Sequence, residues 1–165
     1  MSNQARILTA ALALAASLCA ALPARAADWA LYKHWNFAKP AFIHTLPFAQ
    51  KRIVLQVSKD SPALWNLALN NVGNLLDYWG QGKIRVVLVA YGPGLKMLFA
   101  DTPVAARIQS LNVEGVEFDA CHQTMLKFKR KSGHLPALVP QAAVVPAGIV
   151  RIMQLEEHGF DYVKP

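Results

Sequence analysis

Short apolar segments alternate with segments of helical periodicity from Arg52 to the end of the chain. The apolar runs predict five strands, at residues 53–57, 84–90, 116–120, 142–145 and 160–164. Two strands joined by a helix normally run parallel, and the joining helices then cover both faces of the sheet. The chain is therefore expected to belong to the α/β class, with a three-layer α/β/α arrangement around a mostly parallel five-stranded sheet.

The connecting segments carry helix signals of their own. The segment after the first strand begins with Asp60-Ser61-Pro62, a cap followed by proline in the first helical turn, and it stops at Gly80. Its apolar stripe at helical spacing is Leu64, Ala68, Val72, Leu75 and Trp79. Residues 95–111 predict one helix or two, because Pro103 interrupts the pattern. Further helices are expected at residues 122–131 and 149–158.

Residues 1–26 have the layout of a cleavable signal peptide. Arg6 precedes an apolar run over residues 7–22, which is shorter than the roughly 20 residues that span a bilayer as a helix. The small-residue site Ala24-Arg25-Ala26 follows, so cleavage is expected before Ala27. The mature protein is then periplasmic, with an aromatic-rich arm over residues 27–50 and one α/β domain over residues 51–165. An uncleaved membrane anchor is the alternative.

The formal net charge of +7 falls to +5 on cleavage, because the signal peptide carries Arg6 and Arg25 and no acid. A moderate positive charge with an isolated basic run at residues 127–131 indicates a solvated face rather than a nucleic-acid surface. The chain contains neither G-x-x-x-x-G-K-[ST] nor G-x-G-x-x-G, which argues against a bound nucleotide phosphate. No cofactor, no nucleic acid and, in the mature form, no membrane are expected as partners.

Cysteine usage gives the first indication of function. Cys19 leaves with the signal peptide, so Cys121 remains without a partner in the chain. In an oxidising compartment an unpaired thiol is buried, bonded to another molecule, or used chemically.

The residues that follow the strands are expected to form the site, because open parallel sheets bind ligands at the carboxyl ends of their strands. Cys121 and His122 are the candidate catalytic residues. The candidate ligand-binding residues are Lys59, Asp60, Gly92, Pro93, Gly94 and Gly148. Cys121 directly precedes a predicted helix, whose free N–H groups and dipole favour a thiolate. His122 is a candidate base or charge partner for that thiolate.

Alternative interpretations remain for these residues. Free cysteine is among the most buried residue types, so Cys121 could be an inert core residue, and His122 could lie on the surface. The segment Gly92-Pro93-Gly94 could approach an anion through its backbone or simply turn the chain. No metal site is expected, because His34, His44, His134 and His158 are scattered without ligand spacing.

Three segments of the chain resemble the DsrE/DsrF-like family, in particular its exported members. They are IRVVLVAYGPGLKML, GVEFDACHQTM and AAVVPAGIVRIMQLEEHGFDYVKP, within a resemblance that extends over residues 52–165. The most specific part is the cysteine at a strand end, followed by the V-P-A-G turn and a helix that ends in Gly and an aromatic residue. The resemblance implies a five-stranded parallel sheet and assembly into trimers or hexamers. In intracellular relatives a cysteine carries sulfur as a persulfide.

The leading hypothesis is therefore a periplasmic, sulfurtransferase-like sulfur carrier. The Cys121 thiolate would bind or relay sulfane sulfur as a persulfide, stabilised by Lys59, His122 and the turn at residues 92–94, with a sulfur donor or an acceptor thiol protein as partner. The alternative is a non-enzymatic small-ligand-binding or assembly module in which Cys121 is structural. A thiol oxidoreductase is disfavoured because the chain has no C-x-x-C pair.

The arm at residues 27–50 carries six aromatic residues between Trp29 and Phe48, more apolar surface than a solvated tail tolerates. It is expected to have little regular structure. Two ways of covering it are open: the arm folds back on its own domain, or it reaches a neighbouring subunit. A homo-oligomer, either a trimer or a multiple of it, is favoured, in which the arm contributes to subunit contacts and Cys121 lies near an interface.

Overall fold

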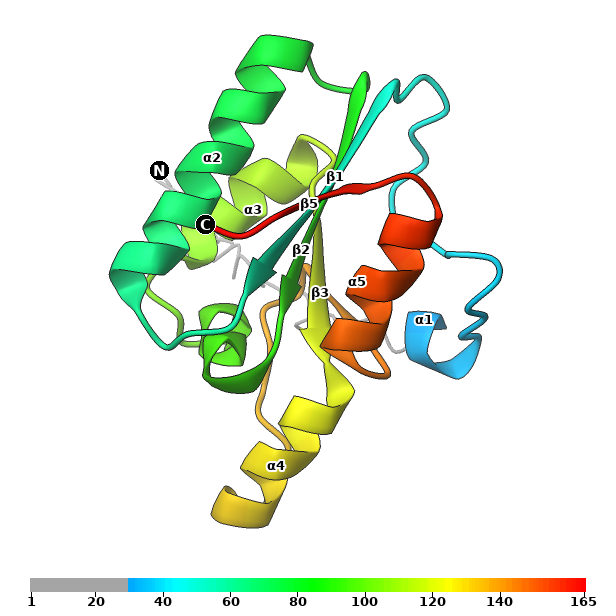
Figure 1. The fold of residues 1–165 in the computed structure, drawn as a ribbon. Helices are drawn as coiled ribbons and strands as arrows, with labels where there is room; N and C mark the ends of the chain where they lie inside the picture. Colours follow the sequence, from blue (N-terminus) through cyan, green and yellow to red (C-terminus); the bar gives the residue numbers. More distant parts are fainter. Residues whose placement is uncertain (1–29) are drawn as a thin grey trace, which may run out of the picture.

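The computed structural model describes residues 30–165, so the predicted signal peptide and the first residues of the arm lie outside the described residues. Five parallel strands form one sheet in the order β4-β3-β2-β1-β5 (Figure 1). The strands are β1 (Lys51–Val57), β2 (Ile84–Ala90), β3 (Glu117–Cys121), β4 (Ala142–Val145) and β5 (Asp161–Val163). Helices cover both faces, which confirms the predicted α/β class and the parallel five-stranded sheet.

Helix α2 (Pro62–Trp79) begins and ends where the sequence predicts. The Leu64 N–H donates to the Ser61 hydroxyl at 3.4 Å, and Gly80 ends the helix with a φ of 85°. The buried face differs by about one residue from the predicted stripe, since its members are Trp65, Ala68, Leu69, Val72 and Leu76. The reason is Trp65, whose indole N–H donates to the Lys59 carbonyl at 2.9 Å and so holds the ring in the core.

The chain between β2 and β3 forms two separate helical elements. The 3₁₀ helix η1 (Gly92–Leu98) is followed by a turn region and then by α3 (Ala105–Val113). Pro103 lies in that turn region, as expected of a residue that interrupts a helix. The later helices are α4 (His122–Ser132), which ends at Gly133 with a φ of 85°, and α5 (Gly148–Glu157).

The two faces of the sheet carry apolar clusters of different size. Helices α2 and α3 and the helix η1 pack on the larger apolar core, to which β3 contributes Phe118 and Ala120. Helix α5 packs on the other face against Val54, Val87 and Val89. Because side chains alternate along a strand, the remaining residues of β3 point to the α5 face. Those residues are Glu117, Asp119 and Cys121.

The arm folds back over the α5 face of its own domain. It contains the short helix α1 (Ala30–Lys33) and continues without regular structure to β1, as predicted (Figure 1). Trp35, Phe37 and Phe42 are half-buried there, whereas Phe48 is 79% exposed. Within the described residues the arm is therefore covered largely by its own chain, which is the first of the two routes expected from the sequence.

Two glycines with opposite surroundings provide a test of this packing. A Cβ on Gly94 would lie 2.7 Å from the Val57 carbonyl carbon, whereas a Cβ on Gly73, inside α2, meets nothing within 4 Å. We expect Gly94→Ala to lower the free energy of unfolding by about 1–3 kcal/mol, because backbone must move. Gly73→Ala should raise it by about 0.5–1 kcal/mol, because alanine favours the helix. Urea unfolding measures both, and equal effects of the two changes would contradict the packing described.

Candidate functional site

Cys121 ends β3 and occupies the N-cap position of α4, at the carboxyl edge of the sheet. It is the free cysteine of the described residues, and 5% of it is exposed. Its register partner on β4 is Val145. The first turn of α4 contains no acidic residue, and basic residues occupy its last turn. The thiol is therefore buried, beside a helix N-terminus that carries no acid in its first turn.

His122 lies next to the thiol in the chain and is covered by the arm. Its ring centroid is 4.4 Å from that of Tyr32 in α1, with the two planes tilted by 55°. Helix α1 in turn lies against β4, the strand beside β3. Burial lowers the pKa of His122 below its usual range, so the imidazole is neutral at physiological pH. His122 is therefore a buried residue rather than a surface histidine.

The predicted glycines make close contacts within the chain. Gly94 packs against the end of β1, and a Cβ on Gly148 would lie 2.8 Å from the Cβ of Tyr91. The Gly92 N–H donates to the Thr124 hydroxyl at 2.9 Å. The sequence predicts Gly92, Gly94 and Gly148 as ligand-binding residues. In the structure, Gly94 and Gly148 lie where a larger residue would collide with neighbouring atoms. Only glycine lets these backbones approach their neighbours so closely.

The other predicted ligand-binding residues separate into two places. Asp60, Gly92 and Pro93 line a groove of about 370 Å³ between η1 and α4. Lys59 lines a smaller cavity of about 90 Å³ near the carboxyl terminus of the chain. Cys121 and His122 are among the lining residues of neither. Neither of these two cavities therefore joins Lys59, Gly92 or Pro93 to the thiol.

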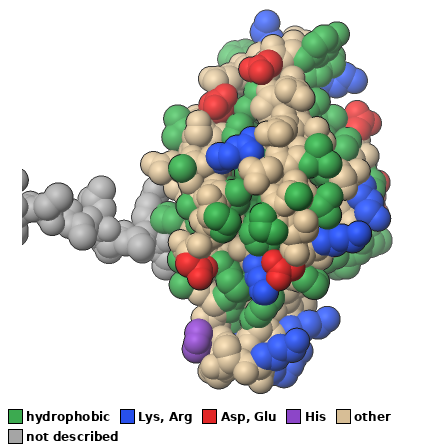
Figure 2. Space-filling model, turned by 90° about the vertical axis from the view of Figure 1, so that its left-hand side faces the viewer, with side chains coloured by type: hydrophobic (Ala, Val, Ile, Leu, Met, Phe, Trp, Pro, Cys, Tyr) green, Lys and Arg blue, Asp and Glu red, His purple; other side chains and the backbone are tan. Residues whose placement is uncertain are grey.

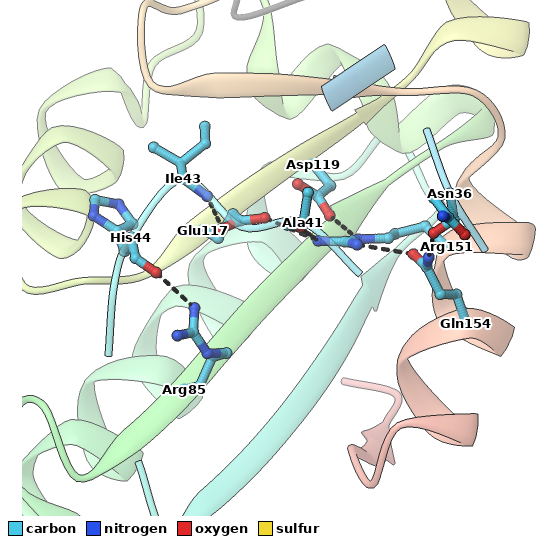
Figure 3. Close-up of polar contacts among 9 residues, drawn as sticks. All are labelled: Asn36, Ala41, Ile43, His44, Arg85, Glu117, Asp119, Arg151 and Gln154. Atoms are coloured by element: carbon cyan, nitrogen blue, oxygen red, sulfur yellow. Dashed lines mark hydrogen bonds and ion pairs between the residues drawn. The ribbon is translucent and has the colours of Figure 1, made fainter. Parts of the chain in front are cut away.

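A buried ionic cluster on the α5 face was not predicted from the sequence (Figure 3). The guanidinium of Arg151, on α5, is completely buried. It donates to Asp119 at 2.7 Å, to Glu117 at 3.0 Å and to the Gln154 side-chain oxygen at 2.9 Å. Its remaining bond goes to the Ala41 carbonyl of the arm at 2.9 Å. All three guanidinium nitrogens thus have acceptors, as a buried arginine requires.

The same cluster attaches the arm to the domain. The Ile43 N–H donates to the Glu117 carboxyl at 2.8 Å, and the Gln154 amide donates to the Asn36 carbonyl at 2.7 Å. A second arginine, Arg85 on β2, donates to the His44 carbonyl at 2.9 Å. Backbone groups along the irregular arm are therefore satisfied by charged and polar side chains of β2, β3 and α5.

Burial raises the pKa of both carboxyls of the cluster. Burial raises the pKa of Glu117 to about 8, and the nearby Asp119 adds to the shift, while Arg151, the Ile43 N–H and Arg85 oppose it. Burial also raises the pKa of Asp119, against the effect of Arg151. The Asp119 Oδ1 atom is buried and has no hydrogen-bond partner among the described residues.

A signal for this cluster was present in the sequence. Glu117 and Asp119 alternate with apolar residues in a strand at the centre of a sheet that is covered on both faces. Acids in such a strand need a buried partner. Arg151, placed among apolar residues in the last helix, is the basic residue that could supply it.

Residues 30–165 contain no group of three or more His, Cys, Asp or Glu side chains placed to hold a metal ion. Over the same residues, no helix combines the length and the apolar character needed to cross a membrane.

Fold and site together define an α/β protein with a parallel five-stranded sheet and, among residues 30–165, one thiol, which lies at the carboxyl edge of that sheet. No protein-family model and no curated protein matches the chain. Among solved structures, it is similar to a protein of unknown function from Methanobacterium thermoautotrophicum, with a TM-score of 0.63 and 28% identity over 70% of this chain and 100% of that one. A protein of unknown function from Bacteroides thetaiotaomicron matches with a TM-score of 0.48 and 17% identity, over 72% of this chain and 98% of that one.

The raised pKa of Glu117 predicts a pH dependence of the free energy of unfolding. The pKa of Glu117 is about 8 in the folded protein, whereas its ordinary value is 4.5. Between these two pH values the folded state binds the proton more tightly than the unfolded state does. The free energy of unfolding should therefore fall as the pH rises from 4.5 towards 8. The slope for one proton is at most about 1.4 kcal/mol per pH unit. Glu117→Gln keeps a neutral donor at every pH, so it should flatten this slope between pH 5 and 8.

Urea unfolding at several pH values measures this effect. Glu157→Gln, an exposed change on α5, is the matched control and should leave the slope unchanged. If the free energy of unfolding had the same pH dependence in the unchanged protein and in Glu117→Gln, the raised pKa of Glu117 would be contradicted.

Proposed function

We propose that this chain is a periplasmic sulfur-handling protein in which the Cys121 thiolate carries sulfane sulfur as a persulfide. The observation that carries the proposal is the position of the thiol, at the junction of β3 and α4 on the carboxyl edge of the sheet. The resemblance to exported members of the DsrE/DsrF-like family supports the same chemistry. The proposed action is that of a sulfurtransferase-like carrier, with a sulfur donor and an acceptor thiol protein as partners.

The surroundings of Cys121 favour an anionic sulfur. N–H groups of the first turn of α4 have no partner within the helix and point towards its N-terminus, and no acid lies in that turn. One of them, the Gln123 N–H, donates to the Pro146 carbonyl at 3.3 Å. Both the thiolate and the persulfide are anions, so the helix N-terminus stabilises each of them. The neutral imidazole of His122 adds no negative charge beside them.

The chemistry requires no redox cofactor. The Cys121 thiolate attacks the sulfane sulfur of a polysulfide or of thiosulfate, and a new S–S bond forms as the S–S bond of the donor breaks. The electron pair of that bond leaves with the shortened polysulfide or with sulfite, and the protein retains Cys–S–S⁻. An acceptor thiolate then attacks the outer sulfur and regenerates the Cys121 thiolate.

The low exposure of the thiol restricts access to it. Small inorganic donors are therefore favoured in the first step. Transfer to a protein thiol requires the cover near Cys121 to open, and α1, whose Tyr32 lies on His122, is the element of the arm placed there.

Mass spectrometry after incubation with polysulfide or thiosulfate tests the proposal. We expect the mass of one added sulfur atom on the peptide that contains Cys121, removable by a reductant, and no such addition at that peptide in Cys121→Ser. The absence of added sulfur at Cys121 with every donor would exclude the carrier function.

The burial of Cys121 favours a second candidate, a non-enzymatic small-ligand-binding or assembly module in which Cys121 only packs. Alkylation by iodoacetamide separates the two. A carrier should be alkylated in the native state at a measurable rate, whereas a structural thiol should react only after unfolding.

We also propose a homo-oligomer, a trimer or hexamer, as the working form. Phe48 in the arm and Ile149 and Met153 on α5 remain exposed in the single chain, 79%, 55% and 49% respectively. Sedimentation equilibrium at micromolar concentration should therefore give a mass above that of one chain. A monodisperse monomer would contradict this prediction.

A further inference from the structure

The groove between η1 and α4 brings together positive charge from two separate elements. Lys96 comes from η1, and Lys127 and Lys131 come from α4. Figure 2 shows Lys and Arg side chains gathered at the lower end of the molecule, the end that α4 forms in Figure 1. The groove has a volume of about 370 Å³, within the range of about 300–1,000 Å³ typical of small-molecule pockets.

The acids of the groove do not balance these charges. Asp60 is the acidic residue in its lining, and it forms an ion pair with Lys96 at 2.6 Å. Neither Lys127 nor Lys131 takes part in an ion pair among residues 30–165. The lining of the groove therefore contains three ammonium groups and one carboxylate, which pairs with Lys96.

The helix dipole explains only part of this arrangement. Basic residues in the last turn of α4, namely Lys129, Arg130 and Lys131, are favoured by the partial negative charge of a helix C-terminus. Lys127 lies before that turn, and Lys96 belongs to another element. Lys127 and Lys131 are also four residues apart on one helix face, a spacing at which like charges repel. An anion in the groove would relieve that repulsion.

The rest of the lining suits an organic ligand. Phe128 and Pro93 provide apolar surface in the groove. The Thr124 hydroxyl accepts a hydrogen bond from the Gly92 N–H, so its own proton remains to be donated to an acceptor. The groove thus combines two unpaired cations, a hydroxyl donor and an aromatic ring.

We propose that this groove binds a small organic dianion, a phosphate ester or a dicarboxylate with an apolar body. The anionic groups lie between Lys127 and Lys131, and the apolar body lies on Phe128. The site is distinct from the proposed sulfur site. Phe128 packs on the larger apolar core, whereas Cys121 points to the α5 face of the sheet.

Calorimetric titration of the full chain with phenyl phosphate, phthalate and inorganic phosphate tests the proposal. Lys127→Gln with Lys131→Gln should weaken phenyl phosphate and phthalate binding by about tenfold or more, since each removes a charged donor. The matched control is Lys129→Gln with Arg130→Gln, which removes the same charge from exposed positions of the same helix outside the groove. It should leave the affinity within about threefold, the effect of screened charges.

Two further variants test the apolar part of the groove and its independence from Cys121. Phe128→Leu should weaken phenyl phosphate binding and leave inorganic phosphate binding unchanged, because only the former has an apolar body. Cys121→Ser should bind every probe normally, so this site and the sulfur site succeed or fail separately. The proposal is overturned if the two double variants lose affinity for the probes equally. It is also overturned if no probe shows saturable binding at millimolar concentration, or if a single-stranded oligonucleotide binds more tightly than every small anion.

Discussion

The buried guanidinium of Arg151 is the interaction on which the rest of this structure depends. A charge removed from water is tolerated only where every donor has an acceptor and a counter-charge lies close by. Here the acceptors come from three parts of the chain that are distant in sequence: Asp119 and Glu117 on β3, Gln154 on α5 and Ala41 in the arm. The position of the last helix and the path of the arm are therefore fixed by the same side chain.

The arm covers the α5 face and forms hydrogen bonds with the buried side chains there. Its carbonyls and an N–H group take up hydrogen bonds that water would otherwise have to supply, and it shields two carboxyls whose pKa values burial raises. Its first helix, α1, lies against β4, with Tyr32 against His122 and against the larger apolar core. The segment beside His122 thus belongs to the same arm that charged and polar side chains attach through residues 36–44.

The alternation of side chains along β3 separates the two proposed activities. Phe118 and Ala120 enter the larger core, towards α2 and η1, while Cys121 points with Asp119 to the α5 face. The carboxyl edge of one sheet consequently carries a thiol on one side and a lysine-lined groove on the other. A ligand in the groove and a sulfur atom on Cys121 do not compete for the same space.

The sequence by itself determined the features that depend on local signals. Apolar runs set the five strands, Ser61 and Pro62 set the start of α2, Pro103 interrupted a helix, and the chain order placed Cys121 where β3 meets α4. Only the tertiary structure decided which residues meet. Arg151 is separated from Asp119 by 32 residues and from Ala41 by 110, and the closeness of Gly94 to β1 and of Lys96 to Lys127 depends on how helices pack across the sheet. Local preferences act over a few neighbouring residues, whereas ion pairs, steric contacts and grooves form between elements whose distance in space the order of residues does not state.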